Sequence, residues 1–251
     1  MKLLALIPAR MGSSRFPGKP MAEILGKPMI GHVYERVAQN SLLTMTAVAT
    51  CDREIFEYIE GIGGKSVMTG NHHERASDRC AEALKILEGE GHRFDVVVMV
   101  QGDEPMTDPD MITEAVKPMM DDDDILVTNL LGKIESQEEF RDRNCIKVVC
   151  DLNGNAMYFS REPIPTLSNN ETHSMGKQVC IIPFRRDFLL EYTRMAPTPL
   201  EIVESIDMLR ILEHGMNVRM VRTMHVTHAV DTKTDLGKVE SLMKKMAPSF
   251  F

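Results

Sequence analysis

Apolar and polar residues alternate in blocks along the chain, and these blocks predict strands and helices in turn. Four apolar runs have the length and composition of buried strands: residues 3–7, 44–50, 66–68 and 94–100. Between them, apolar residues recur with the spacing of a helix face in three segments: residues 30–37, 56–62 and 80–87. Strands that alternate with helices favour right-handed crossovers and a largely parallel sheet.

The second half of the chain predicts a less regular order. A helix face at 111–119 precedes a solvated run of four acids at 121–124 and a strand at 125–131. Segments 144–149 and 156–161 flank an Asn-Gly pair and predict a hairpin. The remaining predicted elements are a candidate mobile loop at 166–177, a strand at 178–184, a helix at 200–212 with Ile202, Ile206 and Leu209 on one side, a strand at 218–222 and a helix at 235–246.

Composition and charge exclude several classes of protein. The 251 residues are 43% apolar and 26% charged, as in ordinary globular proteins, and a chain of this length can form one domain. No apolar run approaches the roughly 20 residues that span a bilayer, and the chain enters its first strand without a signal-peptide pattern. We therefore expect a cytoplasmic protein. A net charge of -8 argues against a general nucleic-acid or anionic-membrane surface, so basic residues must act locally.

Cysteines and histidines give no sign of a metal or disulfide framework. The five cysteines are odd in number and contain no CxxC pair, which favours buried reduced thiols over a zinc site or disulfides. His72 and His73 are neighbours, and in an extended chain their side chains would point apart. We expect them to be loop residues rather than metal ligands.

Cationic and small residues gather in the loop after the first predicted strand, at residues 8–20. Arg10, Arg15 and Lys19 can neutralise an anion there, while small residues let backbone N–H groups approach it. This pattern predicts a site for a phosphate chain. It is not a P-loop, because five residues separate Gly12 from Gly18 and Pro20 follows the lysine. An ordinary strand-to-helix loop with basic residues is the alternative.

Two acids adjoin predicted elements, and the position of one of them, Asp103, suits a magnesium ion. Asp103 follows the most strand-like run of the chain, at the edge where open α/β sheets bind ligands. A turn in which Pro105 opens the next helix also accounts for this segment. Asp231 precedes the last predicted helix, and Thr232 and Asp235 have the spacing of a capping box, which offers a local explanation for that segment.

The motifs together resemble one family. Residues 7–20, IPARMGSSRFPGKP, resemble the signature of nucleotide-sugar pyrophosphorylases and, in this fuller form, the CMP-Kdo synthetase (3-deoxy-manno-octulosonate cytidylyltransferase) family. VQGDEP around Asp103, AVDT around Asp231, and the hairpin segments NCIKVV and AMYFSR are similar to family motifs. The resemblance covers about residues 3–245, in the expected order.

The resemblance implies a fold and an assembly. It implies a single cytidylyltransferase domain over residues 1–251, of the Rossmann-like, glycosyltransferase-A-like α/β type. The sheet is expected to be mainly parallel, with the hairpin and later strands forming a smaller mixed sheet. A homodimer is implied by the resemblance alone.

The resemblance also implies a reaction and a set of site residues. The anomeric hydroxyl of a 3-deoxy sugar acid attacks the α-phosphorus of CTP, and pyrophosphate leaves. The implied catalytic residues are Arg10, Lys19, Asp103 and Asp231, of which Asp103 and Asp231 hold Mg²⁺. The implied nucleotide-binding residues are Pro8, Ala9, Arg10, Gly12, Ser13, Ser14, Arg15, Lys19, Ser77 and Arg79. For Ser77, a role as the cap of the following helix is an alternative.

The part expected to hold the sugar departs from the family pattern. Gln178, Ile182 and Met208 stand where the family typically has histidine, tyrosine and glutamine. Such losses of hydrogen-bond partners can change discrimination between substrates by orders of magnitude. The candidate substrate-binding residues are Gln101, Arg161, Gln178, Asp207 and Arg210.

Two alternatives to a Kdo-specific enzyme therefore stay open. One is a cytidylyltransferase for another acidic acceptor, such as an 8-amino-Kdo-like or other sugar acid, or a phosphonate. The other is a nucleotide-binding protein without catalytic activity. The intact residues Arg10, Lys19, Asp103 and Asp231 argue against it.

Overall fold

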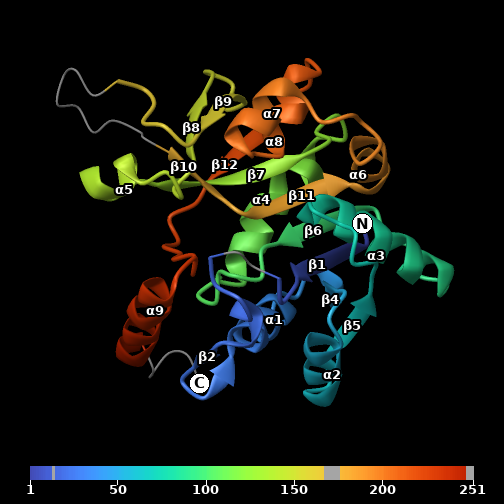
Figure 1. The fold of residues 1–251 in the computed structure, drawn as a ribbon. Coiled ribbons are helices and arrows are strands. Elements are labelled where there is room, and N and C mark those ends of the chain that lie inside the picture. The colour runs from blue at the N-terminus through green and yellow to red at the C-terminus, as the bar shows by residue number, and fades with distance from the viewer. Residues whose placement is uncertain (13–14, 167–175, 247–251) are drawn as a thin grey trace. The chain divides into compact units, whose positions relative to one another are not determined.

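The computed structural model describes residues 1–12, 15–166 and 176–246 (Figure 1). Its contacts divide the chain into two compact units. The first unit comprises Met1–Thr113 and Thr227–Phe251, and the second comprises Glu114–Val226. The single-domain organisation of residues 1–251 stays a prediction.

The first unit is built on parallel strands. Its strands lie in the order β6 (Val96–Val100), β1 (Leu3–Ala9), β4 (Leu43–Thr50) and β5 (Lys65–Met68), and each neighbouring pair is parallel. All residues of β1 and β6 are buried, as expected for strands with both faces covered. The α/β fold with a largely parallel sheet is thus confirmed.

Helices cover both faces of these strands (Figure 1). α1 (Met29–Ala38) connects β1 to β4, α2 (Arg53–Gly61) connects β4 to β5, and α3 (Ala76–Gly89) leads back to β6. Because the last connection reverses direction along the sheet, right-handed crossovers put α3 on the face opposite α1 and α2. The predicted helix face of α3 is confirmed, since Cys80, Leu84 and Leu87 are buried.

The C-terminal segment packs against the loop region after β1. Here lie the short 3₁₀ helix η1 (Lys19–Met21), the strands β2 (Glu23–Ile24) and β3 (Lys27–Pro28), and the last helix, α9 (Lys233–Met246). Val230, Val239 and Met243 share an apolar cluster with Phe16 and Ile24. This cluster fixes residue 230 and its neighbours beside residues that lie more than 200 positions earlier in the sequence.

The second unit contains the predicted mixed sheet. Its strand order is β12 (Arg219–Arg222), β7 (Thr128–Lys133), β10 (Gly176–Val179), β8 (Lys147–Cys150) and β9 (Ala156–Ser160). β12 and β7 are parallel and the other pairs are antiparallel, including the predicted hairpin β8–β9. Residues 167–175 of the predicted loop lie outside the described residues, and its last two residues, Gly176 and Lys177, already belong to β10.

Two predicted elements of the second unit are wrong as single elements. The run 178–184 is split at Cys180 between β10 and β11 (Ile181–Arg185), which the pattern could not reveal because the apolar run continues from Val179 through Cys180 to Ile181. The predicted helix 200–212 is two helices, α7 (Pro199–Glu204) and α8 (Met208–Glu213), because Ser205 has a φ of 54° in the left-handed region, which ends α7. Ile202 is consequently 62% exposed, whereas Ile206 and Leu209 are buried.

The remaining helices are α4 (Asp110–Asp121), α5 (Gln137–Arg141) and α6 (Arg186–Tyr192). No helix within the described ranges has both the length and the apolar character needed to cross a bilayer.

All five cysteines are free thiols, but only Cys80 is buried and the other four are half-buried, so the prediction of buried thiols is wrong for those four.

Candidate active site

Two loops at the carboxyl edge of the first unit's strands frame a pocket. After β1, the chain leads to β4 on one side of β1, and β6 lies on the other side. The strand order therefore switches between β1 and β6, and at such a point the loops that follow the two strands leave a crevice between them. A cavity of about 330 Å³ lies there, lined by three segments of the chain. Its lining residues are Pro8, Ala9, Arg10, Gly12, Arg15, Lys19, Pro20, His73, Glu74, Arg75, Ala76, Arg79, Gln101, Gly102 and Asp103.

Backbone contacts give the loop after β1 its shape. Met11 N donates to the Asp52 carboxylate at 2.8 Å, and Gly18 N donates to Met11 O at 3.0 Å. Gly18 has a φ of 74°, a conformation that glycine adopts without steric cost, and it precedes the 3₁₀ turn that begins at Lys19. The sequence thus folds the loop back on itself and presents Lys19 to the pocket.

A second glycine permits the loops after β1 and β6 to approach. A Cβ on Gly102 would lie 3.2 Å from Pro8 O and 3.3 Å from the Ile30 side chain. Any side chain there would push the two loops apart. Gly102 is therefore part of what brings Asp103 to the same pocket as the loop of residues 8–20.

Three of the four predicted catalytic residues form one group of charges. Lys19 Nζ lies 2.7 Å from Asp103 Oδ2 and 3.6 Å from Asp231 Oδ1. Although Asp231 is 128 positions after Asp103, the two segments are tied together because Val230 N donates to Asp103 O at 2.9 Å. Arg15 Nη2 also contacts Asp231, at 2.9 Å. The side chains of Asp103 and Asp231 are 26% and 21% exposed, so both remain accessible to a ligand.

The donor set of this group fits a magnesium ion. Mg²⁺ takes oxygen ligands, usually one or two protein carboxylates together with substrate phosphates and water. Asp103 and Asp231 supply two carboxylates that already converge on one cationic group, the ammonium of Lys19. The capping contact also exists: Thr232 N and Oγ1 both donate to Asp235 Oδ2 at 2.8 Å. That contact uses Asp235 and leaves the carboxylate of Asp231 to face the lysine.

Two further arginines lie at the segment that precedes and begins α3: Arg10 contacts it from the loop after β1, and Arg79 belongs to α3. Arg10 Nη1 donates to His73 O at 3.4 Å. Arg79 is 3% exposed and donates from Nη1 to Thr69 Oγ1 at 2.6 Å. Its Nη2 is buried and has no hydrogen-bond partner among the described residues. An unpaired buried donor costs on the order of 1–3 kcal/mol, so an acceptor that a ligand brings to Arg79 would be favourable.

Three serines, Ser13, Ser14 and Ser77, were predicted to bind the nucleotide, and the structure describes only Ser77. Ser77 is fully buried as the second residue of α3, whose N-cap is Arg75, so the alternative that Ser77 caps the helix is wrong. Among the described residues, Ser77 is not part of the pocket lining. Ser13 and Ser14 lie outside the described residues.

Of the candidate substrate-binding residues, only Gln101 lies in this pocket. The other four, Arg161, Gln178, Asp207 and Arg210, belong to the second unit. Gln178 Nε2 donates to Asn129 Oδ1 at 2.7 Å, and the backbone carbonyl of Asp207 accepts from the Tyr192 hydroxyl at 3.0 Å.

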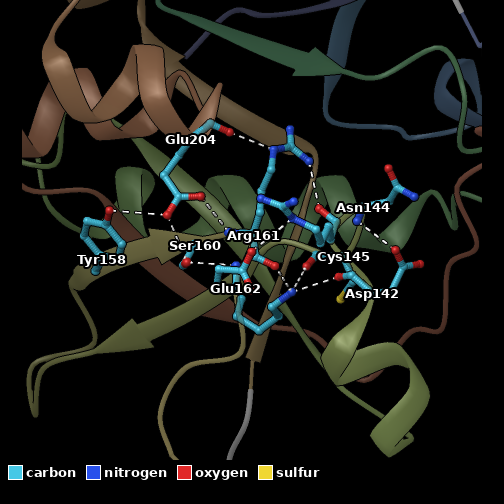
Figure 2. Close-up of polar contacts among 10 residues, drawn as sticks. Asp142, Asn144, Cys145, Tyr158, Ser160, Arg161, Glu162 and Glu204 are labelled. Atoms are coloured by element: carbon cyan, nitrogen blue, oxygen red, sulfur yellow. Dashed lines mark hydrogen bonds and ion pairs between the residues drawn. The ribbon is translucent and has the colours of Figure 1, made fainter.

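Arg161 is engaged in a network within the second unit (Figure 2). Its Nε donates to Glu204 O at 2.7 Å and its Nη1 to Arg143 O at 3.0 Å. The Glu204 carboxylate in turn accepts from the backbone N of Arg161 at 2.9 Å. Lys147 Nζ donates to the carbonyl oxygens of Asp142, Cys145 and Arg161, and burial lowers the pKa of this ammonium.

Arg210 is buried in an ion pair. Its Nε and Nη2 donate to the two carboxylate oxygens of Glu201 at 2.7 and 2.6 Å, and its guanidinium lies 4.8 Å from the centre of the Tyr192 ring. The side chains of Arg210 and Glu201 are 4% and 0% exposed. The hydrogen bonds to Glu201 raise the pKa of Arg210 further. In this conformation the guanidinium has a structural role, and contact with a substrate stays a prediction.

Some residues of the pocket lining were not predicted from the sequence. His73, Glu74 and Pro20 line it although no role was expected for them. Pro20 is the last residue of the predicted loop 8–20 and Glu74 precedes the predicted segment 75–79, but neither residue type by itself indicates a ligand. His73 contributes through its backbone carbonyl, which accepts from Arg10, and a sequence pattern does not reveal such a contact.

Comparison with known proteins gives a consistent result. Residues 4–220 match a family described as cytidylyltransferase. The 3-deoxy-manno-octulosonate cytidylyltransferase of Geobacter metallireducens is 43% identical over 95% of this chain and 96% of its own length. The protein of the same name from Geotalea uraniireducens is 41% identical over 98% of this chain and 100% of its own.

A solved structure agrees with these sequence matches. The structure of CMP:2-keto-3-deoxy-manno-octonic acid synthetase complexed with CTP has a TM-score of 0.89 and 38% sequence identity to this chain. The similarity covers 98% of this chain and 100% of the solved one.

Proposed function

The chain belongs to the cytidylyltransferase family and, within it, to the 3-deoxy-manno-octulosonate cytidylyltransferases, and from this premise we propose that its first unit transfers CMP from CTP to Kdo with release of pyrophosphate. The observation that carries the proposal is the group of Lys19, Asp103 and Asp231 beside a pocket lined with arginines. Phosphates need cations, and a nucleotide with its metal needs accessible carboxylates. This group supplies both.

The residues of the pocket divide the work of binding CTP. Arg10, Arg15 and Lys19 neutralise the triphosphate, and Arg79 adds a buried guanidinium with an unpaired donor. Pro8, Ala9 and Gly12 line the pocket, where their backbone can approach the phosphates. Negative charge on the transferred group and on the leaving pyrophosphate is thereby stabilised where it develops.

Asp103 and Asp231 are the residues that would hold Mg²⁺. When bound, the ion supplies further neutralisation of phosphate oxygens and helps to orient the reactants. The protein's own part is to place both carboxylates beside Lys19, through the loop after β6 and the turn before α9.

The transfer itself is an in-line displacement. The anomeric oxygen of the sugar acid forms a bond to the α-phosphorus of CTP, the bond from that phosphorus to the pyrophosphate oxygen breaks, and the hydroxyl proton passes to solvent. Little covalent chemistry falls to the protein, so the rate depends on positioning and on charge stabilisation. Gln101 lies in the pocket and is a candidate to orient the acceptor.

A second candidate is the same transfer to another acidic acceptor. Ile182 and Met208 are 3% and 0% exposed, and Gln178 is bonded to Asn129, so these departures from the family pattern are packed into the second unit. At these positions the family typically has hydrogen-bonding residues expected to face the sugar, and their replacement would favour another acceptor. Candidates are an 8-amino-Kdo-like acid, another sugar acid or a phosphonate. Homodimerisation and a role in lipopolysaccharide biosynthesis are also proposed, and they rest on the family alone. A cytoplasmic location is proposed from the sequence pattern.

A pyrophosphate-release assay distinguishes these possibilities. Purified protein is mixed with CTP and Mg²⁺ and with Kdo, 8-amino-Kdo, other sugar acids or phosphonates in turn. Turnover with Kdo supports the first candidate, and turnover only with another acid supports the second. CTP binding without turnover on any acceptor would contradict both and favour a non-catalytic nucleotide-binding protein.

A further inference from the structure

Two histidines and a glutamate gather beside the pocket, apart from the group of Lys19, Asp103 and Asp231. The ligand atoms of His72, His73 and Glu82 all lie within 4.8 Å of one another. The two imidazole rings have centroids 4.2 Å apart and are tilted by 42°. The expectation that these neighbouring side chains point apart is therefore wrong, because the chain between β5 and α3 turns rather than extending.

Local structure holds the three side chains together. Glu82 lies on α3, and its Oε2 accepts from Gly70 N at 2.9 Å and contacts His73 Nε2. A Cβ on Gly70 would collide with the His72 ring, so the glycine is what lets that ring lie here. Burial alone would raise the pKa of Glu82, but the hydrogen bonds from Gly70 and His73 outweigh it and lower the pKa, which favours the carboxylate.

We propose that His72, His73 and Glu82 bind a divalent transition-metal ion of the Zn²⁺ class. Two imidazole nitrogens and one carboxylate are the donors of zinc sites with three protein ligands and an open position. Bonds of about 2.0–2.2 Å place two ligands of a tetrahedral ion roughly 3.4 Å apart, so small side-chain rotations from the present cluster suffice. Nitrogen donors also separate this site from the all-oxygen site of Asp103 and Asp231, which suits Mg²⁺.

The site lies where an ion would stabilise the wall of the nucleotide pocket. The ion would join the loop at His72 and His73 to α3 at Glu82. His73 lines the pocket, and its carbonyl accepts from Arg10. The side chains of His73 and Glu82 are 13% and 33% exposed, so two of the three ligands are largely withdrawn from water while a path for the ion remains.

Titration of the metal-free, full-length protein with Co²⁺ and Zn²⁺ tests the site. Co²⁺ is expected to give the strong visible absorption of a low-coordinate nitrogen and oxygen site, and Zn²⁺ is expected to displace it at one equivalent. Weak six-coordinate absorption would overturn the proposal. So would a sulfur-to-cobalt charge-transfer band, since the free cysteines would then be the ligands.

Variants locate the ion. His72→Gln, His73→Gln and Glu82→Gln should each lower Zn²⁺ affinity, measured by chelator competition, by about tenfold or more. Gly70→Ala should also weaken binding, because it displaces the His72 ring. His214→Gln, which changes an exposed histidine of the second unit, is the matched control and should bind as the wild type does. Circular dichroism checks folding, and unchanged affinity in all three folded ligand variants would refute the site.

Discussion

The two units of the molecule use their charged residues in opposite ways. In the first unit, Lys19 and the two aspartates it contacts are partly exposed and line or adjoin an open pocket. In the second unit, Arg210 and Glu201 are almost completely buried and bind each other. Charges of the first kind are available to a ligand, whereas charges of the second kind are satisfied by the protein itself.

This difference separates residues that act on a substrate from residues that hold the fold. Arginines stand in both units, so the residue type alone does not distinguish the roles. The hydrogen-bond partners do: the buried Arg79 keeps a donor at the pocket that is unpaired among the described residues, whereas the buried Arg210 donates to both carboxylate oxygens of Glu201. Substitutions in the two units should therefore affect different properties, activity in the first and stability in the second.

The largest expected effect is on activity, in the group of Lys19, Asp103 and Asp231. Asp103→Asn or Asp231→Asn should lower kcat at saturating Mg²⁺ by a thousandfold or more, because several kcal/mol of transition-state stabilisation depend on the placement of the metal. Pyrophosphate release measures this, with Asp187→Asn, an exposed aspartate of the second unit, as the control. Near-normal turnover of either variant would remove that residue from the site.

The next effect is on stability, in the buried pair of the second unit. Arg210→Met should lower the free energy of unfolding by about 3 kcal/mol or more, because it leaves the carboxylate of Glu201 buried without its partner. Urea unfolding measures the loss. Arg53→Met breaks an exposed pair with Glu57 on α2 and should cost about 0.5 kcal/mol or less. Equal effects of the two substitutions would show that burial does not set the energy.

Lys19→Ala should separate activity from stability within the first unit. We expect kcat to fall by about a hundredfold, since a cationic group beside the transferred phosphate is lost. The unfolding midpoint should change little, because Asp103 and Asp231, which lose their ion pairs with Lys19, are partly exposed and can be solvated by water. A variant that unfolds or loses secondary structure by circular dichroism would instead assign Lys19 a structural role.

The smallest effect concerns the chemistry of one thiol in the second unit. Burial, reinforced by the nearby Glu139, raises the pKa of Cys145 to about 11. Since the thiolate is the nucleophile, alkylation of Cys145 by iodoacetamide should be slow at pH 8 and rise about tenfold per pH unit up to pH 10. Mass spectrometry of the alkylated peptides follows each cysteine. A rate at Cys145 that is flat between pH 8 and pH 10 would contradict the raised pKa.

The sequence predicted the elements of the first unit better than those of the second. Buried parallel strands appear as apolar runs, and helix faces such as that of α3 appear as periodic spacing. In the second unit the same rules joined β10 to β11 and α7 to α8. The breaks at Cys180 and Ser205 depend on backbone conformation and strand partners, which leave no mark in the alternation of apolar and polar residues.

The candidate site shows the same limit. Motifs predicted Lys19, Asp103 and Asp231, and the structure brings the three together. Motifs could not show that Arg161 and Arg210 donate hydrogen bonds to residues of the second unit, because the sequence does not reveal the partners of an arginine. Nor could they show that His72 and His73 turn toward Glu82, which depends on the missing Cβ of Gly70.

A crystal structure with CTP and Mg²⁺ bound would test the central contrast between the two units most directly. We expect the triphosphate in the pocket of the first unit, in contact with Arg10, Arg15 and Lys19, and the metal on Asp103 and Asp231. Arg210 should keep its contacts with Glu201. A nucleotide bound instead by the buried charges of the second unit, with Lys19 still paired to both aspartates, would contradict the account.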